Sequence, residues 1–104
     1  MKKKSGWARE EAVRIIYKVL REGAYSNLAI KQGLEESSLS RLDKALVTEI
    51  VNGTLRNLKR IDWIKSRFIK KNKLSPWIED IIRCGIYQLI FLDRVPDSAV
   101  CNES

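Results

Sequence analysis

The side chains best suited to act on another molecule are eight lysines and arginines within the eighteen residues from Arg56 to Lys73. Only one acidic residue, Asp62, lies among them, so this segment carries the whole net charge of +7 and the remaining residues are formally neutral. A cluster of this density is typical of surfaces that neutralise phosphate groups. The alternative interpretation is a solvated helix face that serves solubility alone.

A helix from Arg60 to Lys71 would divide this segment into two faces. At about 100° per residue, Trp63 falls in the middle of the basic face, opposite an apolar stripe of Ile61, Ile64 and Phe68. An indole among cations suits a nucleic-acid surface, where it would stack on an unpaired base, although burial against a neighbouring helix is an equal alternative. The residues expected to contact nucleic acid are Arg56, Lys59, Arg60, Trp63, Arg67, Lys70 and Lys71, with a second group at Lys3, Lys4 and Arg9.

Other chemistry is limited by what the sequence lacks. There is no histidine, and the two cysteines, Cys84 and Cys101, form no CxxC pair. This composition excludes Cys/His zinc patterns and histidine-based catalysis, and it predicts a buried, unreactive thiol for Cys84. No apolar run approaches the roughly 20 residues of a membrane span, and the N-terminus lacks an apolar signal core. We therefore expect a cytoplasmic protein without membrane contact.

Helical periodicity predicts four elements before the most apolar segment. The first runs from about Trp7 to Glu22 and stops at Gly23, and the second is a short helix capped by Ser26. Ser40 precedes Asp43 by three residues, which predicts a capped third helix. The fourth is the basic helix. The core stripe expected on the third helix consists of Leu42, Leu46, Ile50 and Gly53.

Ser75 and Pro76 predict the start of a fifth helix, with Glu79 and Asp80 favouring the positive end of its dipole. Gly85 predicts a close helix crossing. A possible sixth helix starts near Pro96, and only a few residues follow it, so we expect a truncated domain whose uncovered face supports self-association through Ile82, Ile86 and Leu89. The broad apolar face comprises Ile78, Ile81, Ile82, Gly85, Ile86, Leu89 and Leu92, widened by Cys84, Ile90 and Phe91.

Several stretches resemble the NusB-like family. They are Ala8-Arg9-Glu10, Ile16-Tyr17-Lys18-Val19-Leu20, Gly23-Ala24-Tyr25-Ser26-Asn27 and Thr48-Glu49-Ile50-Val51-Asn52-Gly53-Thr54-Leu55-Arg56. Within the family, Gly85-Ile86-Tyr87-Gln88-Leu89 and residues 92–104 resemble the N-terminal domains of bacterial 16S rRNA cytosine-5 methyltransferases. The resemblance implies an all-α bundle of about seven helices, of which residues 1–104 would hold five and the start of a sixth as a single domain.

The resemblance also implies a function as an RNA-binding domain. Such a domain helps a downstream catalytic domain in the same polypeptide, which depends on S-adenosylmethionine, to engage 16S rRNA. The alternative within the family is an antitermination factor that binds RNA with a ribosomal protein partner. The catalytic cysteines of such methyltransferases follow proline or threonine, whereas Arg83 precedes Cys84 and Val100 precedes Cys101. We therefore expect no catalysis and no cofactor in this chain.

Two interpretations lie outside the family. One is a helix-turn-helix DNA binder built from the third and fourth helices, although the fourth has few side chains suited to reading base edges. The other is a protein-interaction module, which predicts no salt-sensitive binding of nucleic acid.

Overall fold

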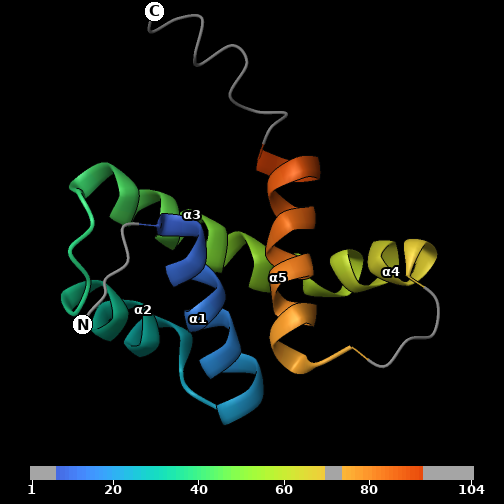
Figure 1. Ribbon diagram of the computed structural model, residues 1–104, viewed down its shortest axis with the longest axis horizontal. Helices are drawn as coiled ribbons and strands as arrows, with labels where there is room; N and C mark the ends of the chain where they lie inside the picture. The colour runs from blue at the N-terminus through green and yellow to red at the C-terminus, as the bar shows by residue number, and fades with distance from the viewer. Residues whose placement is uncertain (1–6, 70–73, 93–104) are drawn as a thin grey trace, which may run out of the picture.

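The computed structural model describes residues 7–69 and 74–92, and within these ranges all regular structure is helical. The predicted all-α class and the five helices are confirmed, while the expected sixth helix lies outside the described residues, as do Lys3, Lys4, Lys70 and Lys71. In chain order the elements are α1 (Ala8–Glu22), α2 (Ser26–Glu35), α3 (Arg41–Arg56), α4 (Leu58–Phe68), α5 (Pro76–Ile86) and η1 (Tyr87–Leu92), a π-helical continuation of α5 (Figure 1).

Local signals set most helix ends as predicted. Gly23 ends α1 in the left-handed conformation, with φ of 77°, which glycine adopts without a steric penalty. The hydroxyl of Ser40 accepts a hydrogen bond from the Asp43 amide at 3.1 Å, and that of Ser75 accepts one from the Ile78 amide at 3.3 Å. Both serines therefore cap their helices.

The prediction for Ser26 was wrong, because Ser26 is the first residue inside α2 and Tyr25 occupies the N-cap position. The basic helix α4 also begins two residues earlier than expected, at Leu58, and its assigned end at Phe68 precedes the predicted one.

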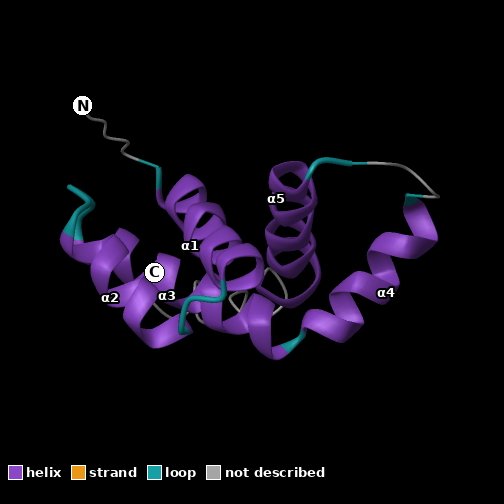
Figure 2. Cartoon of the chain, turned by 90° about the horizontal axis from the view of Figure 1, so that it is seen from below, coloured by secondary structure: helices purple, strands orange, loops and turns teal. Residues whose placement is uncertain are grey.

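The core lies where α1 packs against α2, α3 and α5. Ile15 and Ile16 on α1 and Ile50 on α3 are almost completely buried, as expected for apolar side chains at helical spacing. Figures 1 and 2 both show α5 standing between α1 and α4. Helix α5 thus packs against α4 more extensively than α3 does.

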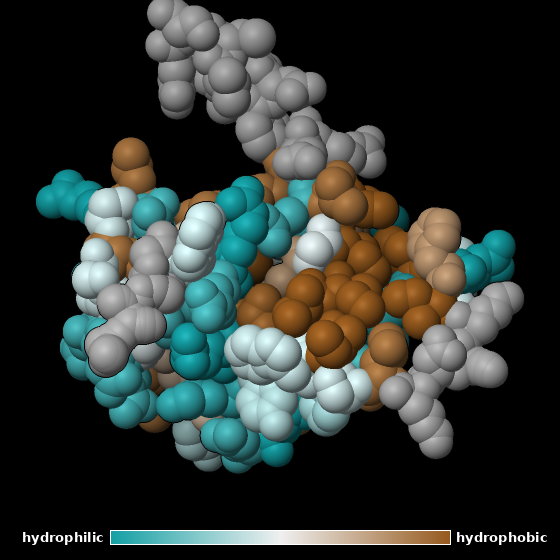
Figure 3. Space-filling model, in the orientation of Figure 1, coloured by the Kyte–Doolittle hydropathy of each residue, from teal (hydrophilic) through white to brown (hydrophobic). Residues whose placement is uncertain are grey.

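The predicted apolar face of α5 is only partly the face that packs inwards: Cys84 is buried and Ile86, Phe91 and Leu92 pack against the core as expected, whereas other members of the face are exposed. The buried residues on the inward face are Asp80 and Cys84, followed by Tyr87 at the start of η1. Ile78 and Ile81 are each about two-fifths exposed, and Leu89 is 70% exposed. Figure 3 shows a broad hydrophobic region on the surface over α5. The sequence pattern did not place Asp80 on the inward face because one of the two arginines that balance its charge, Arg21, is 59 residues away in the sequence.

Two other apolar residues were wrongly expected in the core. Leu42 in the first turn of α3 is 81% exposed, and Phe68 at the end of α4 is 79% exposed. Both lie at helix ends, where the neighbouring helix no longer covers the stripe. Self-association through the α5 face stays a prediction.

The close helix crossing occurs at Gly53 and not at Gly85 as predicted. A Cβ atom on Gly53 would overlap the phenol ring of Tyr87, whereas one on Gly85 would meet nothing within 4 Å. The hydroxyl of Tyr87 donates a hydrogen bond to Glu49 at 2.5 Å, and its ring stacks on Phe91. These contacts hold the ring in place, so α3 and η1 can approach only where α3 lacks a side chain.

Two glycine variants test this packing. Gly53→Ala should lower the free energy of unfolding by about 1 to 3 kcal/mol, because the added methyl group must displace the ring of Tyr87. Gly85→Ala is the matched control and should raise it by up to about 1 kcal/mol through helix propensity. Urea denaturation followed by circular dichroism measures both, and equal effects would contradict the crossing at Gly53.

The predicted burial of Cys84 is confirmed, since its side chain is 2% exposed. Burial raises the pKa of the Cys84 thiol to about 12, so the reactive thiolate is scarce below that pH. Iodoacetamide at pH 8 should therefore leave Cys84 unmodified in the folded protein and alkylate it in urea. Peptide mapping by mass spectrometry measures this, and rapid alkylation without denaturant would contradict the buried position.

Candidate nucleic-acid interface

Helix α4 leaves the bundle through a bend at a single residue, Asn57, which separates it from α3. The backbone amide of Asn57 donates to the carbonyl of Gly53 at 3.0 Å, and its side-chain amide donates to the same oxygen at 2.9 Å. Asn57 therefore closes the last turn of α3 while the chain changes direction. Figure 2 shows α4 diverging from the remaining helices beyond this bend.

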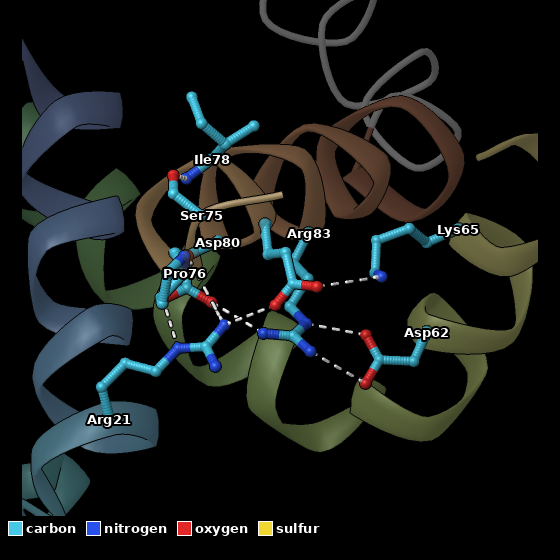
Figure 4. Close-up of polar contacts among 9 residues, drawn as sticks. Arg21, Asp62, Lys65, Ser75, Pro76, Ile78, Asp80 and Arg83 are labelled. Atoms are coloured by element: carbon cyan, nitrogen blue, oxygen red, sulfur yellow. Dashed lines mark hydrogen bonds and ion pairs between the residues drawn. The ribbon is translucent and has the colours of Figure 1, made fainter. Parts of the chain in front are cut away.

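A network of charged side chains fixes α4 against α5 (Figure 4). The Arg83 guanidinium donates to the two carboxylate oxygens of Asp62 on α4 at 2.7 and 3.3 Å. It also donates to Asp80 at 2.8 Å, which is one turn earlier on its own helix. These hydrogen bonds outweigh the cost of burial and hold the pKa of Arg83 above its ordinary value, so Arg83 remains charged.

The network continues to α1 and to the far end of α4. Arg21 on α1 donates to Glu79 at 2.9 Å and to Asp80 at 3.3 Å, so the completely buried carboxylate of Asp80 has two guanidinium partners. Lys65 on α4 pairs with Glu79 at 3.8 Å. Asp62 and Lys65 thus both face α5, and the only acid of the basic segment is neutralised by Arg83.

The opposite face of α4 is cationic and open to solvent. Trp63, whose exposure the sequence left open, is 61% exposed. The guanidinium carbon of Arg67 lies 5.2 Å from the centroid of its ring, and that of Arg60 lies 5.7 Å from the ring of Phe91 on η1. Both arginines are therefore held by cation–π contacts with their charge still accessible to solvent. Lys59 is exposed on the same side of the helix.

An open hollow of about 510 Å³ lies at the bend between α3 and α4. Arg56 at the end of α3 meets Lys59 and Arg60 there, so three of the predicted contact residues share one depression. We refer to this hollow together with Trp63 and Arg67 as the α4 face. The hollow is lined by Leu55, Arg56, Asn57, Leu58, Lys59 and Arg60.

The structure does not bring all the predicted contact residues together. Arg9 lies on α1, where its side chain donates to Gln88 of η1 at 2.5 Å, and α5 stands between α1 and α4 (Figure 1). Sequence reasoning also missed Phe91 and Asn57, which position Arg60 and the bend. The sequence placed Phe91 on the apolar face of the fifth helix but did not indicate its contact with Arg60, which depends on the packing of η1.

Among the described residues no group of histidine, cysteine, aspartate or glutamate side chains could hold a metal ion. In the described ranges, no helix has the length and apolar character needed to cross a membrane.

The structure defines an all-helical domain with an exposed cationic face on α4. The profile of the NusB family matches residues 7–104. The chain belongs to the NusB family, and the predicted resemblance is confirmed.

Two kinds of relative share this similarity. The chain is 36% identical to the "Probable ribosomal RNA small subunit methyltransferase B" of Bacillus subtilis, an alignment that covers 100% of this chain and 23% of that protein. It is 33% identical to the Synechocystis protein of the same name, covering 91% of this chain and 22% of that protein. The chain thus spans less than a quarter of the length of these methyltransferases.

The second kind is the "Transcription antitermination protein NusB" of Ruminiclostridium cellulolyticum. It is 29% identical over 93% of this chain and 69% of that protein. A search of the solved structures found none that matches.

The buried carboxylate provides a test of how α4 is held. Asp80→Asn should lower the free energy of unfolding by about 3 kcal/mol or more, because Arg21 and Arg83 lose their shared buried counter-charge. Glu10→Gln, which removes one partner of the exposed Glu10–Arg14 pair, is the control and should change it by less than about 1 kcal/mol. Urea denaturation measures both variants. Similar small effects would show that the network contributes little to stability.

Proposed function

We propose that this chain is the RNA-binding domain of a 16S rRNA cytosine-5 methyltransferase. In this proposal the domain helps a catalytic domain in the same polypeptide to engage rRNA. That catalytic domain would use S-adenosylmethionine and would lie outside the present chain. The identity to methyltransferase relatives along the whole chain supports the assignment of the parent protein.

The observation that carries the RNA-binding part is the charge distribution on α4. Arg56, Lys59, Arg60 and Arg67 are all exposed, while Asp62 is turned towards Arg83. The face therefore presents four cations, and the one carboxylate of α4, which is 39% exposed, is paired with Arg83. Such a surface gains affinity for RNA by releasing the counterions of the phosphates that it contacts.

An antitermination factor is the second candidate, favoured by the similarity to NusB proteins over 93% of the chain. In that case tight binding would need a specific single-stranded RNA and a ribosomal protein partner. The two candidates differ in their partner requirement, since a domain that recruits a catalytic domain in cis should bind rRNA alone.

The test is fluorescence anisotropy of the 104-residue protein with a 16S rRNA hairpin and with a DNA duplex of matching sequence. We expect preference for the RNA and a steep loss of affinity between 50 and 200 mM salt (about 10³-fold for six phosphate contacts). The double variant Lys59→Ala/Arg67→Ala should bind more weakly and show a shallower salt dependence, because two phosphate contacts are lost.

The matched control is Lys31→Ala/Arg41→Ala, which removes the same charge from exposed positions on α2 and α3. It should retain nearly all the affinity. Equal losses of RNA affinity in the two double variants would show that only the net charge of the protein matters, and not the position of the cations on α4. Absence of RNA binding by the folded protein alone would refute the proposal and would favour an antitermination factor that needs its protein partner, or a protein-interaction module.

A further inference from the structure

Arg60 on the α4 face is held by an element other than α4. Its guanidinium carbon lies 5.7 Å from the centroid of the Phe91 ring on η1. Arg67 differs, because its ring partner is Trp63, one turn earlier on the same helix. A cation–π contact restrains a guanidinium while its N–H donors, at the edge of its plane, stay available to phosphate oxygens. The position of the Arg60 guanidinium therefore depends on where η1 places Phe91.

Phe91 is in turn anchored by Tyr87. Their rings stack along η1, with centroids 5.7 Å apart and planes inclined by 16°. Tyr87 is only 4% exposed, its ring occupies the space beside Gly53, and its hydroxyl donates to Glu49 on α3. Aromatic pairs at this separation attract each other beyond the effect of burial alone. A continuous series of contacts thus runs from Gly53 on α3, through two rings, to a guanidinium that lines the hollow.

An arginine that is already held in place costs less to bring into a complex than a mobile one. Each long side chain that becomes ordered only on binding lowers the affinity roughly 2- to 12-fold. Lys59, the neighbour of Arg60 in the hollow, is an exposed lysine on a flexible four-carbon stem. The two cations therefore differ in how far their positions are set before a ligand arrives.

We infer that Phe91, anchored by Tyr87, is a positioning residue of the RNA-binding site, which holds the Arg60 guanidinium ready to contact a phosphate. Phe91 acts through Arg60 and need not touch the RNA itself. Arg60 should therefore contribute more affinity than Lys59, although both are exposed cations. This inference rests on the proposed function and adds to it a residue outside α4 on which the strength of binding depends.

The experiment is a double-mutant cycle on the 104-residue protein, with Kd for the 16S rRNA hairpin measured by fluorescence anisotropy at one salt concentration. Its four members are the wild type, Phe91→Leu, Arg60→Ala and the double variant. Leucine keeps an apolar side chain in the packing of η1 but removes the ring, and Phe91→Tyr is the conservative variant that keeps it. Lys59→Ala is measured for comparison with Arg60→Ala. Leu89→Ala, at a 70% exposed position of η1, is the matched control.

Phe91→Leu should weaken binding about 2- to 12-fold, because the RNA must then order the Arg60 side chain itself. In the Arg60→Ala background the same change should have no further effect, since the guanidinium that the ring holds is absent. Phe91→Tyr and Leu89→Ala should both bind like the wild type. Arg60→Ala should weaken binding more than Lys59→Ala does. Circular dichroism establishes that each variant is folded.

Two kinds of result would overturn the inference. If Phe91→Leu has no effect, weakens binding equally with and without Arg60, or is matched by an equal loss in Phe91→Tyr, then Phe91 does not act through Arg60. The proposed RNA-binding function would still stand on the affinity of the wild type. If the folded wild type binds no rRNA hairpin, the proposed function is refuted and the inference is refuted with it.

Discussion

The buried carboxylate of Asp80 is the constraint on which the arrangement of the last two α-helices depends. A charge with no exposed surface requires compensation, and here it is shared between Arg21 of α1 and Arg83 of α5. Because Arg83 also binds Asp62, the same group that balances Asp80 attaches α4. The same contact therefore sets both the orientation of α4 and the charge of its outer face. Because Asp62 points towards Arg83, the residues around Trp63 on the outer face are cations.

The existence of the helices, and the ends that Gly23, Ser40 and Ser75 set, could be predicted because their causes are local. Gly23, Ser40 and Ser75 act on amides or carbonyls within the same turn, so each is visible in a few residues of sequence. The inward face of α5 could not be predicted in this way. From the sequence alone, Asp80 is expected to be an exposed acid in the first turn of a helix. Its burial depends on Arg21, which is 59 residues away in the chain. The π-helical turn at η1 adds a second deviation, since its wider spacing alters which residues share a face.

In the candidate site, too, the features within one helix could be predicted and the features that depend on other elements could not. A helical wheel was sufficient to place Lys59, Trp63 and Arg67 on one side of α4, because one helix carries all three. The features that shape this face come from elsewhere: the ring beneath Arg60 belongs to η1, and the hollow depends on the bend at Asn57. Neither leaves a periodic signal in the sequence. Arg9, which the sequence assigns to a second contact group, is exposed on α1 and donates to Gln88, and its contact with nucleic acid stays a prediction.

The crossing at Gly53 has a consequence for motion. The carbonyl of Gly53 accepts both hydrogen bonds from Asn57, and the ring of Tyr87 occupies the space that a side chain at Gly53 would fill. The bend before α4 and the start of η1 are therefore both held at Gly53. The ion pairs at the other end of α5 hold the middle of α4. An arm restrained at its root and along its length does not swing as a hinge. Amide hydrogens in the first turns of α4 should therefore exchange with solvent together with those of the core, through opening of the whole bundle, and not by separate fraying of one helix.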